Sequence, residues 1–83
     1  MSKDERIKEQ LHLWSLLYPK HPLAIGLKIK VDPENEYAAE WQGEFVITGI
    51  SIDHHHRINI TIADNLTDGG YDGWGTGDLM PVF

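Results

Sequence analysis

Two neighbouring apolar segments in the second half of the chain constrain its fold more than any other feature. They cover residues 44–52 and 57–63, and only a short polar connection separates them. In the second segment Ile58, Ile60 and Ile62 alternate with polar residues, which is the pattern of a strand with one buried face. The short connection predicts that the two segments pair as an antiparallel hairpin.

The alternation in these segments also predicts the register of the hairpin. A shift of one residue would turn every side chain to the opposite face, so the pattern decides which faces meet. Ile50 and Ile52 should share a buried face with the three isoleucines of the second strand, while Asn59 and Thr61 point away. The first strand is apolar on both faces, with Phe45 and Ile47 on one and Val46, Ile50 and Ile52 on the other. A strand of this kind needs a second packing layer.

The N-terminal region has the features of an amphipathic helix that could supply that layer. Ser2 and Glu5 have the spacing of a capping box. Pro19 and Pro22 cannot continue a helix, so we predict that the helix spans about residues 3–18. Its apolar residues recur with the helical period, at Ile7, Leu11, Trp14 and Tyr18, and the stripe is widened by Leu13, Leu16 and Leu17. We expect Ile7, Leu11, Trp14 and Leu17 to lie in the folded core.

The glycines of the central segment and the end of the chain resemble a known architecture. Gly43 and Gly49, the alternating isoleucines and the closing run 78–82 are similar to an SH3-like barrel of the KOW type. In that barrel a glycine-containing strand pair is followed by a short return strand. The resemblance covers about half of the chain. It implies a module that binds protein, binds RNA or is purely structural, because this barrel serves all three purposes.

We therefore predict an α+β fold in which an N-terminal amphipathic helix packs on a small antiparallel SH3-like β-barrel of about five strands. Residues 1–83 should form a single domain, with the helix in 1–18 and the barrel in 24–83. Residues 24–31 supply its first strand, since apolar residues alternate there with glycine and lysine. The alternative is that a helix or strand face is left for a partner or for a second copy in a homodimer.

Charge is distributed unevenly along the chain, whose net charge is −6. Residues 1–31 contain six basic and three acidic residues, a net charge of +3, whereas residues 32–83 contain one basic and ten acidic residues, a net charge of −9. Nucleic-acid surfaces carry clustered lysine and arginine that neutralise phosphates, so an acidic barrel is not expected to bind nucleic acid directly. A basic protein partner is expected instead.

The sequence gives no indication of export or of a membrane span, so we expect a cytoplasmic protein without membrane contact. It contains no cysteine, which excludes disulfide bonds. It also lacks a long apolar run and a basic-then-apolar leader pattern.

Aromatic and acidic residues in the glycine-rich segment 65–77 are the candidate partner-binding site. Tyr71 and Trp74 stand among five glycines there, and aromatic side chains in such loops are frequent interface anchors. We assign partner binding to Tyr71, Trp74, Asp68, Asp72 and Glu44. The alternative for Trp74 is that it folds back and caps the mouth of the barrel.

Other motifs give weaker indications of chemistry. His54, His55 and His56 are candidate metal ligands. They are weak candidates, because adjacent strand residues point to opposite faces and further ligands are missing. Residues 64–75 fail the calcium-loop pattern, and 73–77 lack the lysine and helix of a phosphate loop. Neither Ser15 nor Ser51 has an evident base, so we predict no enzyme activity, no cofactor and no dedicated metal site.

These observations favour a small non-enzymatic protein-binding module that binds a basic partner through an acidic, aromatic surface. The small size and the acidity also resemble accessory proteins of phages and mobile elements, some of which inhibit basic host proteins that handle nucleic acids. Two alternatives stay open. One is a KOW-like nucleic-acid or ribosome-associated module that uses the N-terminal basic residues with Lys20, Lys28 and Lys30, and the other is metal binding through the histidine triplet.

Overall fold

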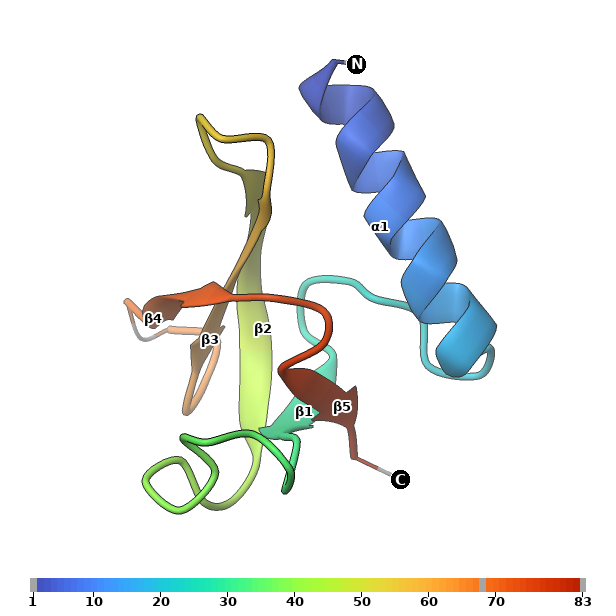
Figure 1. Ribbon diagram of the computed structural model, residues 1–83. Coiled ribbons are helices and arrows are strands. Elements are labelled where there is room, and N and C mark those ends of the chain that lie inside the picture. The colour runs from blue at the N-terminus through green and yellow to red at the C-terminus, as the bar shows by residue number, and fades with distance from the viewer. Residues whose placement is uncertain (1, 68, 83) are drawn as a thin grey trace.

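The computed structural model describes residues 2–67 and 69–82 as one helix and five strands (Figure 1). The elements are α1 (Lys3–Leu17), β1 (Lys28–Val31), β2 (Phe45–Ile52), β3 (Ile58–Ala63), β4 (Tyr71–Trp74) and β5 (Leu79–Pro81). The strands form one antiparallel sheet in the order β4-β3-β2-β1-β5. This arrangement confirms the predicted α+β class, with an N-terminal helix packed against a five-stranded antiparallel sheet.

The sheet is not closed into the barrel that we predicted. β4 and β5 are its two edges, although only the short connection 75–78 separates them in the sequence. The chain turns there through a hydrogen bond from Asp78 N to Gly75 O, and β5 then pairs with β1 instead of β4. α1 covers the core of the open sheet, because Trp14 packs in the same cluster as Ile29, Ile47 and Leu79.

The hairpin of β2 and β3 has the predicted pairing, but one irregularity changes the facing of β2. Ile50 pairs with Ile60 and Ile52 with Ile58, as expected. Between the pairs Ile47–Ile62 and Gly49–Thr61, β2 contains one extra residue, so Thr48 and Gly49 together oppose Thr61. This bulge moves Phe45 and Ile47 onto the same face as Ile50 and Ile52, where we had expected Val46. Our assignment of two separate apolar faces was therefore wrong.

Gly49 lies at this bulge, where the two strands approach closely. A Cβ atom added at Gly49 would lie 3.3 Å from the Cβ and Oγ1 atoms of Thr61, which is tighter than ordinary van der Waals contact. The bulge therefore explains a glycine that interrupts an otherwise apolar strand.

The ends of α1 confirm the helix prediction. Ser2 Oγ accepts a hydrogen bond from Glu5 N at 3.2 Å, and Tyr18 is the residue at the C-terminal end. Trp14 is 1% exposed and donates from Nε1 to His21 O at 2.7 Å, which fixes the chain as it leaves the helix. In the described part of the chain no helix has the length and apolar character needed to cross a bilayer.

The predicted apolar stripe of α1 is only partly buried. Leu17 is 68% exposed and Leu16 65%, and Leu13 is also exposed, so our placement of Leu17 in the core was wrong. Of the other three residues expected in the core, Trp14 is buried there, Leu11 is partly buried against it, and Ile7 is half-buried and not part of the core cluster. Successive residues turn about 100° around a helix. Ile7, Leu11 and Trp14 therefore share one face, and the three leucines lie to its side.

Candidate functional site

The loop between β1 and β2 is built from short-range turns that start directly after Val31. Asp32 Oδ1 accepts from Glu34 N at 3.0 Å, and Asn35 Oδ1 accepts from Tyr37 N at 2.8 Å. Asp and Asn side chains stabilise turns in this way because they reproduce the hydrogen bonding of a backbone turn. A further hydrogen bond joins Trp41 N to Tyr37 O at 3.1 Å. The loop therefore has a defined course in spite of its acidic, polar composition.

Asp78 attaches this loop to the connection between β4 and β5. Its Oδ1 accepts from Asn35 Nδ2 at 2.9 Å, and its Oδ2 accepts from Gly75 N at 2.9 Å. Its backbone carbonyl accepts from Asp32 N, also at 2.9 Å. In Figure 1 the loop lies at the opposite end of β2 from the tip of the β2–β3 hairpin. These contacts bring two segments that are far apart in the sequence into one surface.

The result is an aromatic cluster centred on Trp41. Its ring centroid lies 4.9 Å from that of Tyr71, 5.3 Å from that of Trp74 and 5.9 Å from that of Phe45. The planes of Tyr71 and Trp74 are inclined to that of Trp41 by 72° and 83°. Edge-to-face pairs of this kind are favoured by the aromatic quadrupole. The rings therefore form a corner with nearly perpendicular walls and not a flat stack.

Two pockets open beside this corner, and both are lined by Trp41, Asp72 and Trp74. One has a volume of about 520 Å³ and includes Tyr71, on the side of the β3–β4 connection. The other, of about 260 Å³, lies toward the β1–β2 loop and includes Glu36. The charged residues that line the two pockets are all acidic. We call this surface, made of Glu36, Tyr37, Trp41, Tyr71, Asp72 and Trp74, the aromatic–acidic site.

The structure brings together three of the five residues assigned to partner binding. Tyr71, Asp72 and Trp74 all belong to β4 and to this site. Trp74 is only 7% exposed and belongs to the core, whereas Tyr71 is 56% exposed. Glu44 lies apart in a shallow hollow beside Lys28. Asp68 is outside the described residues.

Sequence reasoning missed three members of the site, namely Glu36, Tyr37 and Trp41. The available signal was the same one that selected the β4 residues, since Glu36-Tyr37 and Glu40-Trp41 place aromatic residues beside acidic ones in a loop. The sequence does not show that this loop lies close to β4. That proximity is supported by the hydrogen bonds of Asp78 to Asn35 and Gly75.

The histidine triplet forms the tip of the β2–β3 hairpin and is exposed. Asp53 Oδ1 accepts from the backbone amides of His55 and Arg57, at 2.8 and 3.0 Å. These bonds, above all that from Arg57, hold the pKa of the Asp53 carboxyl below its usual value. The rings of His54 and His55 are 4.0 Å apart. Among residues 2–67 and 69–82, no three His, Cys, Asp or Glu side chains are placed to hold a metal ion.

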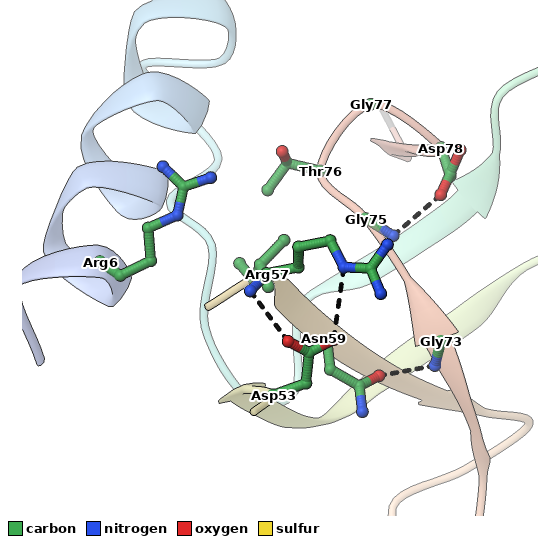
Figure 2. Close-up of a pocket in the computed structure, with 10 residues that line it drawn as sticks. Arg6, Asp53, Arg57, Asn59, Gly73, Gly75, Thr76, Gly77 and Asp78 are labelled. Atoms are coloured by element: carbon green, nitrogen blue, oxygen red, sulfur yellow. Dashed lines mark hydrogen bonds and ion pairs between the residues drawn. The ribbon is translucent and has the colours of Figure 1, made fainter. Parts of the chain in front are cut away.

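A separate groove of about 540 Å³ lies between α1, the hairpin tip and the β4–β5 connection (Figure 2). We call it the arginine groove, because Arg6 and Arg57 line it. Arg6 enters it from α1 and Arg57 from the hairpin, with Thr76 and its glycine neighbours between them. Arg6 pairs with Glu9 at 2.8 Å and donates from Nε to His56 O at 3.1 Å. Arg57 Nε is 3.7 Å from Asp53 Oδ2. Both cations therefore lie beside acceptors within the chain, Arg6 at hydrogen-bond distance and Arg57 in a longer, more exposed ion pair.

The two serines considered as nucleophiles have structural partners. Ser15 Oγ donates to His12 O at 2.6 Å, which is a local helix contact, and Ser51 Oγ donates to Asn59 O at 3.4 Å across the hairpin. Neither bond is the hydrogen bond to a side-chain base that activates a serine nucleophile.

Comparison of the chain with models of protein families, with curated proteins and with solved structures finds no match. Its function is therefore argued from the geometry and charge of the surfaces described above.

Proposed function

We propose that this chain is a non-enzymatic protein-binding module of the SH3-like, KOW-type class, which binds a basic segment of a partner protein through the aromatic–acidic site. The observation that carries the proposal is the meeting of Trp41 with Tyr71 and Trp74 at centroid distances of 4.9 and 5.3 Å, in a surface whose charged members are acidic. Interfaces concentrate their binding free energy in aromatic anchors of this kind.

The charge distribution supports the same partner. The net charge of −9 over residues 32–83 produces a negative field around the site, and such a field accelerates the approach of a basic partner. At the site itself, Glu36 and Asp72 form no ion pair within the described chain, where the two ion pairs are Arg6–Glu9 and Arg57–Asp53. Their charges are therefore available to a cationic partner.

A role as an accessory protein or inhibitor of a basic host protein, as in phages, follows from the same chemistry. Such a partner handles nucleic acid with a basic surface, and an acidic module can occupy that surface in place of phosphates. A cytoplasmic location belongs to this proposal.

The test is a selection of short random peptides on the immobilised chain, with a Glu36→Lys, Asp72→Lys double variant as the matched control. We expect the wild-type chain to enrich peptides rich in Lys and Arg, and the double variant to lose them. Enrichment of neutral peptides, or recovery of the same peptides by the double variant, would contradict the proposal.

Mobility-shift titrations with RNA and duplex DNA at two salt concentrations cover the alternative nucleic-acid function. Phosphate contacts give an affinity that falls steeply with salt. A salt-sensitive shift that is lost when Lys28 and Lys30 are changed to Gln would favour the KOW-like nucleic-acid module instead.

A further inference from the structure

The two pockets of the aromatic–acidic site adjoin each other across shared residues. Trp41, Asp72 and Trp74 line both of them. Tyr71 belongs only to the larger pocket, and Tyr37 only to the smaller one. Two aromatic side chains, Trp41 and Trp74, therefore border both hollows, and Trp41 is the less buried of the two.

The carboxylates are distributed so that each hollow has a negative charge. Asp72 borders both, and Glu36 adds a second carboxylate to the smaller pocket. Asp78 also lines the smaller pocket, but both of its carboxylate oxygens accept hydrogen bonds from the chain, which fixes its position. Each hollow therefore combines an aromatic wall with a carboxylate, the combination that binds a cationic side chain with an apolar stem.

We infer that the site binds two arginine side chains, at positions i and i+2 of an extended basic segment, one in each pocket on either side of Trp41. Alternate side chains of an extended segment point the same way and are about 7 Å apart. A cation interacts with an aromatic ring within about 6 Å of its centroid, so one ring can contact both. Arginine fits better than lysine because its planar guanidinium stacks on rings and binds carboxylates with two hydrogen bonds.

This inference rests on the proposed function, and its test separates the two. The probes are glycine- and serine-flanked peptides that carry Arg-Ser-Arg, either arginine alone, two adjacent arginines, or Lys-Ser-Lys. Calorimetry with the full chain gives their affinities, compared with one another at the same salt concentration and repeated at a second one. We expect Arg-Ser-Arg to bind about fivefold to tenfold more tightly than either single-arginine peptide. The adjacent pair has the same charge but directs its side chains to opposite sides, so it should bind like a single arginine.

Two exposed tyrosines allow each pocket to be altered separately without a change in the core. Tyr37→Ala alters the smaller pocket and Tyr71→Ala the larger one, and melting temperatures verify that both variants fold. Each variant should remove most of the advantage of Arg-Ser-Arg over the single-arginine peptides. In the wild-type chain, the NMR signal of the Trp41 indole N–H, assigned with Trp41→Phe, should shift on binding of Arg-Ser-Arg.

Four outcomes would overturn the inference. Equal affinity for the adjacent and alternate arginine pairs would mean that only net charge is recognised. Equal affinity for Lys-Ser-Lys would remove the assignment to arginine. Salt-sensitive peptide binding that leaves Trp41 and both tyrosine variants unaffected would place the interface elsewhere while the proposed function stands. Absence of binding to every basic peptide would reject the proposed function together with the inference.

Discussion

The arginine groove and the smaller pocket of the aromatic–acidic site share Gly73 and Asp78 in their linings. The arginines of the first groove have ion-pair partners in the described chain, whereas the charged members of the aromatic–acidic site have none there. In the arginine groove the cations have acceptors within the chain, since Arg6 contacts Glu9 and His56 O, and Arg57 lies near Asp53. In the aromatic–acidic site, Glu36 and Asp72 form no ion pair with the described residues. The first groove therefore joins α1 to the hairpin tip through Arg6 and His56 O, and the second is the surface that we propose binds a partner.

This difference leads to a division of effects between stability and binding. A hydrogen bond already made within the chain contributes to the free energy of unfolding. A carboxylate without an ion-pair partner in its own chain contributes to association with a cationic partner molecule. Substitutions at the α1 joint should change stability and leave binding intact. Substitutions of the exposed members of the aromatic–acidic site, Glu36, Tyr37, Tyr71 and Asp72, should do the reverse.

The largest expected effect is at the packing of α1 on the sheet. Trp14→Ala should lower the free energy of unfolding by about 3 to 5 kcal/mol, because it removes a fully buried indole and its hydrogen bond to His21 O. Leu16→Ala in the same helix is the control, and it should change stability by less than about 0.5 kcal/mol because Leu16 is exposed. Denaturant unfolding measures both. Equal effects would mean that the exposed leucines are covered in solution, as in a homodimer.

The second prediction compares the two grooves directly by association kinetics with an arginine-rich peptide. Glu36→Lys with Asp72→Lys should slow association by about tenfold or more at low salt, because it reverses the local field. Arg6→Gln removes the ion pair with Glu9 within α1 and the hydrogen bond to His56 O at the hairpin tip. It should cost at most about 1 kcal/mol of stability, while the association rate stays near that of the wild type. If Arg6→Gln slowed association as much as the double lysine variant, the peptide would also contact the arginine groove.

A smaller effect is expected at the hairpin tip that Arg6 contacts. His56 has a φ of 60°, in the left-handed region that costs a non-glycine residue about 1 kcal/mol or more. His56→Gly should therefore raise the free energy of unfolding by about 0.5 kcal/mol, after allowance for the entropy of glycine. His55→Gly is the control and should give no gain. If both variants are destabilised equally, strain at His56 is not released.

The smallest expected effect is the pH dependence contributed by Asp53. Its pKa is lower in the folded chain, mainly because Arg57 N donates to the carboxylate. The ionised form then stabilises the fold above the unfolded-state pKa of about 3.9, and this contribution is lost as the pH falls through the lower folded-state value. Melting temperatures of Asp53→Asn should decline less than those of the wild type between mildly acidic and strongly acidic pH. Parallel curves would contradict this assignment.

Local sequence patterns predicted much of the fold. The Ser2 cap and the prolines after Tyr18 define a helix that the structure places at Lys3–Leu17. The period of two in the isoleucines predicted that Ile50 and Ile52 share a face with the isoleucines of β3, and the pairs Ile50–Ile60 and Ile52–Ile58 agree with this. These features succeed because helix ends and strand faces depend on residues within a few positions of one another.

For the candidate site, the sequence singled out the acidic second half and the β4 residues Tyr71, Asp72 and Trp74, because their composition is visible without a fold. Only the tertiary structure decided the rest. The bulge at Thr48–Gly49 decided which residues of β2 are buried, and the orientation of α1 on the sheet left Leu16 and Leu17 exposed. The placement of Trp41 against Tyr71 depends on Asp78 holding a loop more than thirty residues earlier in the chain. Such contacts join segments that are far apart in the sequence, and local hydrophobic patterns carry no information about them. They form only when the whole chain packs.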